Sequence, residues 1–339
     1  MSKRVVLPPL PKVSDLLRIY GVRAKKQLSQ NFILDQNITD KIAGEADVFD
    51  CFVCEVGSGP GSLTRSVLHA GARHVAAVEI DRRFIPALEI FRQHHGISKS
   101  KEVQKMLADC SEGKIKVYNE NIMKFNVPAA FSKVEGVEWE KDYLPSVRLV
   151  GNLPFNVSIP LLLQWLEAIS HRAGPFTFGR VPMSLVFQKE VADNIVAKPG
   201  HPNCSRLSIM AQHLCEVKRN YRLPRTVFVP EPKVDAALLH LIPLKQPKID
   251  APYEIVEQVV KALFSLKRKF IRSSLKCLFP GDEHLVDDFL ALADIDPTLR
   301  ATDVDMAGAN RLCGAFLEMT ENMNLDRLPL KINRPSPVQ

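Results

Sequence analysis

The chain lacks any uninterrupted apolar run approaching the roughly 18 residues that suggest a membrane-spanning helix. Its seven cysteines are scattered and odd in number, which argues against a disulfide framework and favours a reducing compartment. Cys51 and Cys54 have the spacing of a metal-binding pair, but no second pair of ligands follows nearby. Because they lie in the apolar run 51–56, we interpret them as buried strand residues. The sequence therefore predicts neither a membrane segment nor a metal site.

Acidic residues are scarce near the N-terminus, where residues 1–28 contain seven basic residues and one acid, Asp15. A basic, acid-poor start is typical of an organelle transit peptide. Pro8, Pro9 and Pro11 would interrupt an amphipathic helix, however, which favours a basic arm that contacts RNA. Both interpretations of residues 1–28 stay open. The net charge of +7 is compatible with a polyanionic partner.

Short apolar runs separated by helical patterns occupy the first two thirds of the chain. We expect strands at 53–56, 75–80, 115–118, 147–150, 184–187 and 236–241. Strands that alternate with helices predict an α/β fold with a parallel sheet covered on both faces. A polar, Lys-rich insertion of unknown shape lies between Gly96 and Gly113.

After Pro243 the pattern becomes helical, with apolar residues at helical spacing from Ile255 to Phe264 and no further strand signal. We place a domain boundary near residue 246. The expected organisation is an arm at 1–28, an α/β domain at 29–246, a helical domain at 247–322 and a disordered tail at 323–339.

A glycine-rich loop follows the first predicted strand and precedes a predicted helix. Gly57, Gly59 and Gly61 would let the backbone pass close to a ligand. Glu79 ends the next strand, where a carboxylate can accept both hydroxyls of a ribose. Glu55, before the loop, would repel a pyrophosphate but suit a cationic amino-acid group. S-adenosylmethionine therefore fits better than NAD; the alternative is a glycine turn that binds nothing.

A third polar segment ends the strand at 115–118. Asn121 would meet the adenine of the cofactor there, and Ile80 and Ile122 could sandwich the adenine ring. Taken alone this signal is weak, because an ordinary turn at a strand end has the same composition.

Asn152-Leu153-Pro154-Phe155 follows the fourth predicted strand, at the same edge of the sheet as the other motifs. The N6 amine of adenine is a poor nucleophile because its lone pair is delocalised into the ring. The side-chain carbonyl of Asn152 and the backbone carbonyl of Leu153 could accept its two N–H bonds and direct the lone pair at a sulfonium methyl group. Pro154 would fix the turn, and Phe155 would stack on the base. We therefore predict methyl transfer to adenine N6; the alternative is an ordinary Asn-Pro turn.

Acids are absent from residues 261–276, which contain a cluster of basic residues. We expect one helix through this region, ending before Pro280, with Arg268, Arg272 and Lys276 on one face beside Lys267. A basic face without compensating acids suits RNA phosphates, and a merely solvated face is the alternative.

The ordered motifs resemble those of the ribosomal RNA adenine N6-dimethyltransferases. They are Gln30-Asn31-Phe32, Glu55 to Gly61, Glu79, Asn121-Ile122-Met123, Asn152 to Phe155 and Phe228 to Asp235. The form of Leu28 to Phe32 and of Asn152 to Phe155 is most similar to the mitochondrial branch, the mitochondrial dimethyladenosine transferases, also called mitochondrial transcription factor B. The resemblance covers roughly residues 20–315.

The resemblance implies a Rossmann-like, S-adenosylmethionine-dependent methyltransferase domain and a small helical domain that docks on RNA. It implies dimethylation of two adjacent adenines in a hairpin near the 3′ end of small-subunit rRNA, and a mitochondrial matrix location rather than a cytoplasmic or nuclear one. The expected catalytic residues are Asn152, Leu153, Pro154 and Phe155, and the expected RNA contacts are Lys267, Arg268, Arg272 and Lys276. The expected cofactor site comprises Gln30, Asn31, Ile33, Gly57, Gly59, Glu79, Ile80, Asn121, Ile122 and Asn152.

Two residues depart from the family pattern: Asn121 stands where an Asp is usual, and Ser29 where many relatives have Gly. Neither removes a group that the chemistry needs. The alternatives are a non-catalytic nucleic-acid-binding factor of the mitochondrial transcription machinery, a small-molecule methyltransferase and a large-subunit rRNA methyltransferase of the erythromycin-resistance type. The intact Asn152 motif favours an enzyme over a non-catalytic factor, and the basic arm and basic helix speak against a small-molecule substrate. The mitochondrial-type motifs favour action on small-subunit rRNA, or on the assembling small subunit, over the erythromycin-resistance type.

Overall fold

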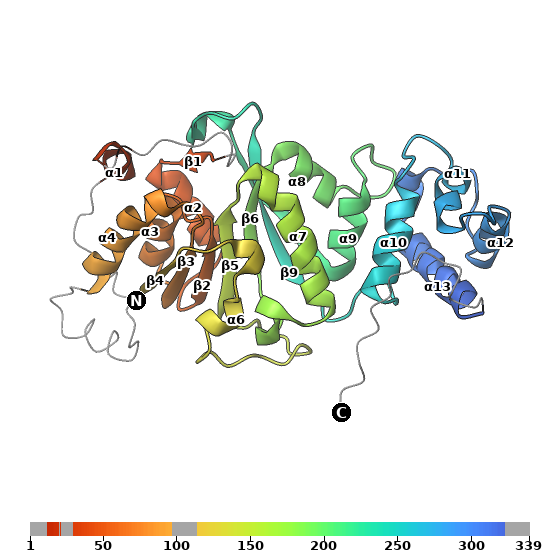
Figure 1. Ribbon diagram of the computed structural model, residues 1–339, viewed down its shortest axis with the longest axis horizontal. Coiled ribbons are helices and arrows are strands. Elements are labelled where there is room, and N and C mark those ends of the chain that lie inside the picture. The colour runs from red at the N-terminus through yellow and green to blue at the C-terminus, as the bar shows by residue number, and fades with distance from the viewer. Residues whose placement is uncertain (1–11, 20, 22–29, 97–113, 323–339) are drawn as a thin grey trace. The chain divides into compact units, whose positions relative to one another are not determined.

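The computed structural model describes residues 12–19, 21, 30–96 and 114–322 (Figure 1). Most of the predicted arm, the Lys-rich insertion and the tail after residue 322 lie outside these residues. The chain forms two compact units, one of residues 1–192 with 216–245 and the other of residues 193–215 with 246–339. Residues 193–215, which the sequence analysis assigned to the α/β domain, therefore cluster with the helical unit.

The first unit is built on a seven-stranded sheet with the order β4-β3-β2-β5-β6-β9-β7 (Figure 1). Strands β2 to β6 pair parallel with one another, whereas β9 pairs antiparallel with β6. The sheet is therefore mixed, and the expectation of a wholly parallel sheet was wrong at β9. The strands are β2 (Phe52–Val56), β3 (His74–Val78), β4 (Ile115–Tyr118), β5 (Val147–Asn152), β6 (Met183–Gln188), β7 (Cys215–Leu223) and β9 (Ala236–Pro243).

Burial explains why the central strands are continuous apolar runs. All five residues of β3 are buried, as expected for a strand in a sheet that is covered on both faces. Ile42, Val67 and Leu88 from three different helices share one core with Val53 and Val75 of the sheet. The helices of this unit are α1 (Val13–Ile19), α2 (Gln36–Glu45), α3 (Ser62–His69), α4 (Ile85–Gly96), α6 (Val127–Ala130), α7 (Phe155–Ser170) and the start of α8 (Lys189–Val196).

Two short strands that the sequence analysis did not predict form a separate ladder. β1 (Phe32–Ile33) pairs antiparallel with β8 (Phe228–Val229). The pairing joins segments almost 200 residues apart along the chain. It holds residues 32–33 next to the motif at 228–235.

The second unit is helical, as the periodicity after Pro243 predicted. Its aromatic core is formed by Phe279, Phe289 and Phe316, whose ring centroids lie 5.5–6.1 Å apart. Its helices are the end of α8, α9 (Arg206–Leu214), α10 (Tyr253–Leu263), α11 (Ile271–Leu275), α12 (Leu285–Leu292) and α13 (Met306–Asn322). None of the helices in the described ranges is long and apolar enough to cross a membrane.

Short 3-10 helices complete both units. They are η2 (Arg82–Phe84), η3 (Ile122–Lys124), η4 (Gly174–Phe178), η5 (Arg225–Val227), η6 (Lys276–Leu278) and η7 (Ala301–Asp303).

Candidate active site at the carboxyl edge of the sheet

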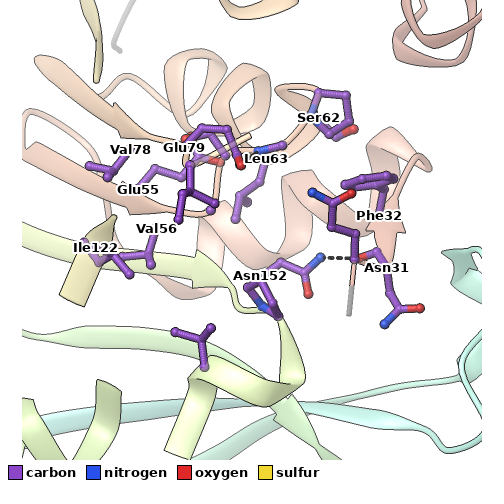
Figure 2. Close-up of a pocket in the computed structure, with 18 of the residues that line it drawn as sticks. Asn31, Phe32, Glu55, Val56, Ser62, Leu63, Val78, Glu79, Ile122 and Asn152 are labelled. Atoms are coloured by element: carbon purple, nitrogen blue, oxygen red, sulfur yellow. Dashed lines mark hydrogen bonds between the residues drawn. The ribbon is translucent and has the colours of Figure 1, made fainter. Parts of the chain in front are cut away.

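A pocket of about 300 Å³ lies where β2, β3 and β5 end (Figure 2). This is the edge at which open α/β sheets bind their ligands. All ten residues of the predicted cofactor site line the pocket, although they come from five separate parts of the chain. They are Gln30, Asn31, Ile33, Gly57, Gly59, Glu79, Ile80, Asn121, Ile122 and Asn152. Their contacts with a cofactor remain a prediction.

The glycine loop after β2 has the backbone that only glycine adopts without strain. Gly57 and Gly59 have φ values of 67° and 52°. The Gly57 N–H donates to the Val78 carbonyl at 2.9 Å, which ties the loop to the end of β3. A Cβ atom on Gly59 would lie 3.2 Å from the Phe32 ring, so a side chain there would press on the segment opposite.

Glu79 holds the same loop from the other side. One carboxylate oxygen, Oε2, accepts from the Gly59 N–H, and the other, Oε1, accepts from the Asp81 N–H, both at 2.8 Å. Burial raises the pKa of Glu79, and the two backbone donors act in the opposite direction because they favour the ionised form. A carboxylate has about four acceptor positions, so Glu79 keeps acceptor capacity for a ligand's hydroxyl groups.

Three buried polar side-chain atoms of the pocket have no hydrogen-bond partner among the described residues. They are Oε2 of Glu55, Oγ of Ser58 and Oγ of Ser62. Burial raises the pKa of Glu55 to about 8, and the nearby Glu79 carboxylate acts in the same direction. Ser62 begins α3, whose N-cap Gly61 provides no side-chain cap. A helix N-terminus binds carboxylates, and a lone buried glutamate suits an ammonium group. The donor set therefore fits the amino-acid end of S-adenosylmethionine.

The opposite wall is apolar with one polar residue. Ile80 is 54% exposed, which is unusual for isoleucine and leaves a face available to a ring. Ile122 lies in η3 beside it in the lining. The Asn121 Oδ1 atom accepts from the Met123 N–H at 3.0 Å and keeps a second lone pair for a ligand amine.

Asn152 is the last residue of β5, and its amide has one orientation. Its Nδ2 atom donates to the Asn31 carbonyl oxygen at 2.9 Å, the dashed line in Figure 2. Since a backbone carbonyl can only accept, the amide nitrogen must face Asn31, and Oδ1 is left as an acceptor. An acceptor at this position is what the methyl-transfer hypothesis requires.

The other three predicted catalytic residues differ in their placement. Pro154 lines the pocket and is the N-cap of α7, whereas the side chain of Leu153 is buried at 2% exposure. Phe155 is partly buried against the hydrophobic core and does not line the pocket. Its stacking on a base therefore stays a prediction. Asn156, which the sequence analysis missed, also lines the pocket, and its place one residue after Phe155 was the available signal.

The predicted basic helix of the second unit is interrupted. Helix α10 ends at Leu263, residues 264–268 form turns, and a new helix begins at Ile271. The Ile271 N–H donates to the Leu299 carbonyl at 2.8 Å rather than to a preceding turn of helix. The expectation of one continuous helix with Arg268, Arg272 and Lys276 along one face was therefore wrong.

Two of these cations have acidic partners that follow them in the chain. Arg272 binds both carboxylate oxygens of Asp287, with its Nη2 atom 2.6 Å from Oδ2, and Lys276 binds Glu283 at 2.6 Å. Lys267 instead donates to the Pro202 carbonyl at 2.8 Å, and the described part of the chain shows no ion pair for it. The idea that the whole cluster lacks compensating acids was therefore wrong for Arg272 and Lys276.

Comparisons with known proteins identify the family of the chain. The profile of the ribosomal RNA adenine dimethylase family matches residues 21–295. The chain belongs to the ribosomal RNA adenine dimethylase family. It is 43% identical to the mitochondrial dimethyladenosine transferase 1 of Xenopus tropicalis, over 94% of this chain and 88% of the relative. It is 42% identical to the human protein of the same name, over 93% and 87%.

Solved structures support the fold. A dimethyladenosine transferase from Plasmodium falciparum superimposes with a TM-score of 0.56 at 23% identity, covering 85% of this chain and 96% of that one. The 23S rRNA methyltransferase ErmE gives a TM-score of 0.54 at 23% identity, covering 84% and 99%. The first unit therefore has the Rossmann-like methyltransferase fold.

Proposed function

We propose that this dimethylase-family protein transfers methyl groups from S-adenosylmethionine to the N6 amines of two adjacent adenines in small-subunit rRNA. The observation that carries the proposal is the Asn152 amide, held with Oδ1 as an acceptor at the mouth of a pocket that fits the cofactor. Family membership and relatives named dimethyladenosine transferases support the reaction class.

The pocket has a separate set of groups for each end of the cofactor. Glu55 and the first turn of α3 would hold the amino-acid end, Glu79 the ribose hydroxyls, and Asn121 with Ile80 and Ile122 the adenine. When bound, S-adenosylmethionine supplies an electrophilic methyl group on its sulfonium.

The chain's own residues prepare the acceptor nitrogen. Asn152 Oδ1 and the Leu153 carbonyl each accept one N–H of the adenine amine, which weakens conjugation with the ring and directs the lone pair outward. No strong base is required, because the alkylated nitrogen is acidic and loses its proton readily. Most of the acceleration therefore comes from positioning, which can supply about 7–11 kcal/mol of a barrier. After one methylation an N–H remains for one of the two acceptors, so a second transfer is feasible.

The kind of RNA that can serve as substrate depends on whether its adenine can reach the pocket. A stacked, paired adenine cannot reach the carboxyl edge of the sheet, and extruding a base costs least in a single-stranded loop. We propose a hairpin loop near the 3′ end of small-subunit rRNA as the target, with the basic segment of the second unit as an RNA contact. The named relatives are mitochondrial, which supports a mitochondrial location and, more finely, the matrix.

The test is methylation of a synthetic hairpin carrying two adjacent loop adenines. Mass spectrometry of nuclease fragments should show four added methyl groups with the wild-type chain and almost none with Asn152→Ala. A fully paired version of the same RNA is the matched control. Monomethyl product alone, or equal modification of the duplex, would contradict the mechanism. RNA binding without methylation would support the non-catalytic alternative.

A further inference from the structure

The orientation of Asn152 depends on a backbone atom of a different segment. The Asn31 carbonyl that accepts from Asn152 Nδ2 belongs to residues 30–33, which cross the carboxyl edge of the sheet and which we call the strap. If the strap shifted by about 1 Å, Nδ2 would lose this acceptor and the hydrogen bond would no longer hold the amide in one orientation. A misplacement of that size can cost roughly 100-fold in rate.

Three contacts hold the strap. Phe32 packs edge-on against Phe84, with ring centroids 5.2 Å apart, and β1 pairs with β8. A side-chain hydrogen bond joins the strap to the segment after β3: Gln30 Nε2 donates to Asp81 Oδ2 at 3.1 Å. Gln30 and Asp81 are 8% and 7% exposed, so water does not compete freely for this bond.

Asp81 is itself held firmly. Arg83 contacts its carboxylate through Nε at 3.0 Å and Nη2 at 2.6 Å, and the Arg83 N–H donates to Oδ1 at 3.2 Å. These donors, led by the Arg83 side chain, lower the pKa of Asp81 to about 2, so the carboxylate is ionised at neutral pH. A charged acceptor with two fixed oxygens gives Gln30 a defined anchor.

We propose that Asp81 is a positioning residue for methyl transfer: through Gln30 it fixes the Asn31 carbonyl, and that carbonyl sets the Asn152 amide with Oδ1 toward the adenine amine. The proposal rests on the catalytic role of Asn152 proposed above. It extends the site to a residue that does not line the pocket and that the sequence analysis did not select.

The first measurement concerns the amide and does not require activity. The side-chain Nδ2–H₂ signals of Asn152, assigned by their loss in Asn152→Ala, should move and exchange faster in Asp81→Asn and in Gln30→Met. Arg83→Gln is the comparison variant: because it loosens Asp81 but keeps the Gln30 acceptor, it should move these signals less than Asp81→Asn does. Unchanged Asn152 signals in Asp81→Asn would overturn the proposal, whatever the protein's activity.

The second measurement is the single-turnover rate of methyl transfer to the loop hairpin. We expect about a tenfold lower rate for Asp81→Asn and Gln30→Met, and no further loss when either is combined with the other. In the Asn152→Ala background, Asp81→Asn should have no added effect, because the path it acts through is already removed. The affinity for S-adenosylmethionine, measured by calorimetry, should change less than about threefold in Asp81→Asn.

The outcomes separate the two hypotheses. Multiplicative effects of Asp81→Asn and Asn152→Ala, or a loss of cofactor affinity in parallel with the rate, would show that Asp81 acts elsewhere and would overturn the proposal. A normal rate for Asn152→Ala would instead refute the catalytic role of Asn152, and the amide signals would still decide whether Asp81 orients it. If Asp81→Asn does not fold, Gln30→Met provides the amide-signal test with the Asp81 cap of η2 intact; its cofactor affinity is not used, because Gln30 itself lines the pocket.

Discussion

The split between paired and unpaired cations in the second unit leads to a quantitative prediction about RNA binding. Arg268 and Lys269 are exposed in the turn after α10, and no acidic partner is described for either. Arg272 and Lys276 are also partly exposed, but each already binds a carboxylate. A cation that must first leave an acid partner contributes less to counterion release than a free one.

The perturbation is a pair of double variants with equal loss of charge. Arg268→Ala with Lys269→Ala should lower the slope of log affinity against log salt by about 0.7 for each lost phosphate contact, so by about 1.4 in total. Between 50 and 200 mM salt, a fourfold change, wild-type affinity should therefore fall about sevenfold more than that of the variant. Arg272→Ala with Lys276→Ala should leave the slope nearly unchanged.

The assay is fluorescence anisotropy with the labelled loop hairpin at four or more salt concentrations. Affinity for S-adenosylmethionine is the internal control, since its site lies in the first unit. Equal slope losses in the two double variants would mean that the Arg272–Asp287 and Lys276–Glu283 pairs open when RNA binds. An unchanged slope for Arg268→Ala with Lys269→Ala would show that the turn is merely solvated.

Three further predictions concern the pocket. Asn152→Ala should lower methyl transfer by about 100-fold or more while largely preserving cofactor affinity, and near-normal turnover on the hairpin would refute its role. Glu79→Ala should weaken S-adenosylmethionine binding by about 1.5–3 kcal/mol for each charged hydrogen bond lost; calorimetry showing unchanged affinity would place the ribose elsewhere. The pKa of Glu55 is raised to about 8 in the folded chain, above its unfolded value of about 4.3. Between these values the folded state keeps a proton that the unfolded state has lost, so the free energy of unfolding should fall as pH rises from about 5 to 8. Glu55→Gln should flatten that fall in guanidinium titrations, with a residual slope from Glu79, and an equally steep fall in the variant would contradict the assignment.

The strands and loops of the pocket were predictable because their signals are local. A short apolar run such as 75–78, closed by acidic residues, favours a buried strand, and polar residues just after such runs collect at one edge of a parallel sheet. This is why Gly57, Glu79, Asn121 and Asn152 could be assigned to one pocket without any knowledge of tertiary contacts. The antiparallel β9 was not predicted as such, because an isolated apolar strand carries no information about its direction.

The break in the basic helix could not be predicted from local sequence. Residues 264–271 contain no proline or glycine, and their intrinsic preference is compatible with a helix. Tertiary contacts override that preference, because Phe270 pairs with Arg300 and the Ile271 N–H bonds to Leu299. The acid partners of Arg272 and Lys276 lie 15 and 7 residues further along the chain, beyond the reach of helical spacing rules.

The strap shows the same limit at the site itself. Both Gln30 and Asn152 were predicted from the sequence as site residues. The hydrogen bond that orients Asn152, however, joins residues 121 positions apart. Its acceptor is a backbone carbonyl, which every residue type has, so residue identity does not predict it. Asp81 is equally inconspicuous, since an acid after a strand commonly caps the next turn, as it does here. Residue types at the carboxyl edge therefore predict which groups meet a ligand. The orientation of those groups is set by segments that reach the edge from elsewhere in the chain, and a catalytic amide depends on both.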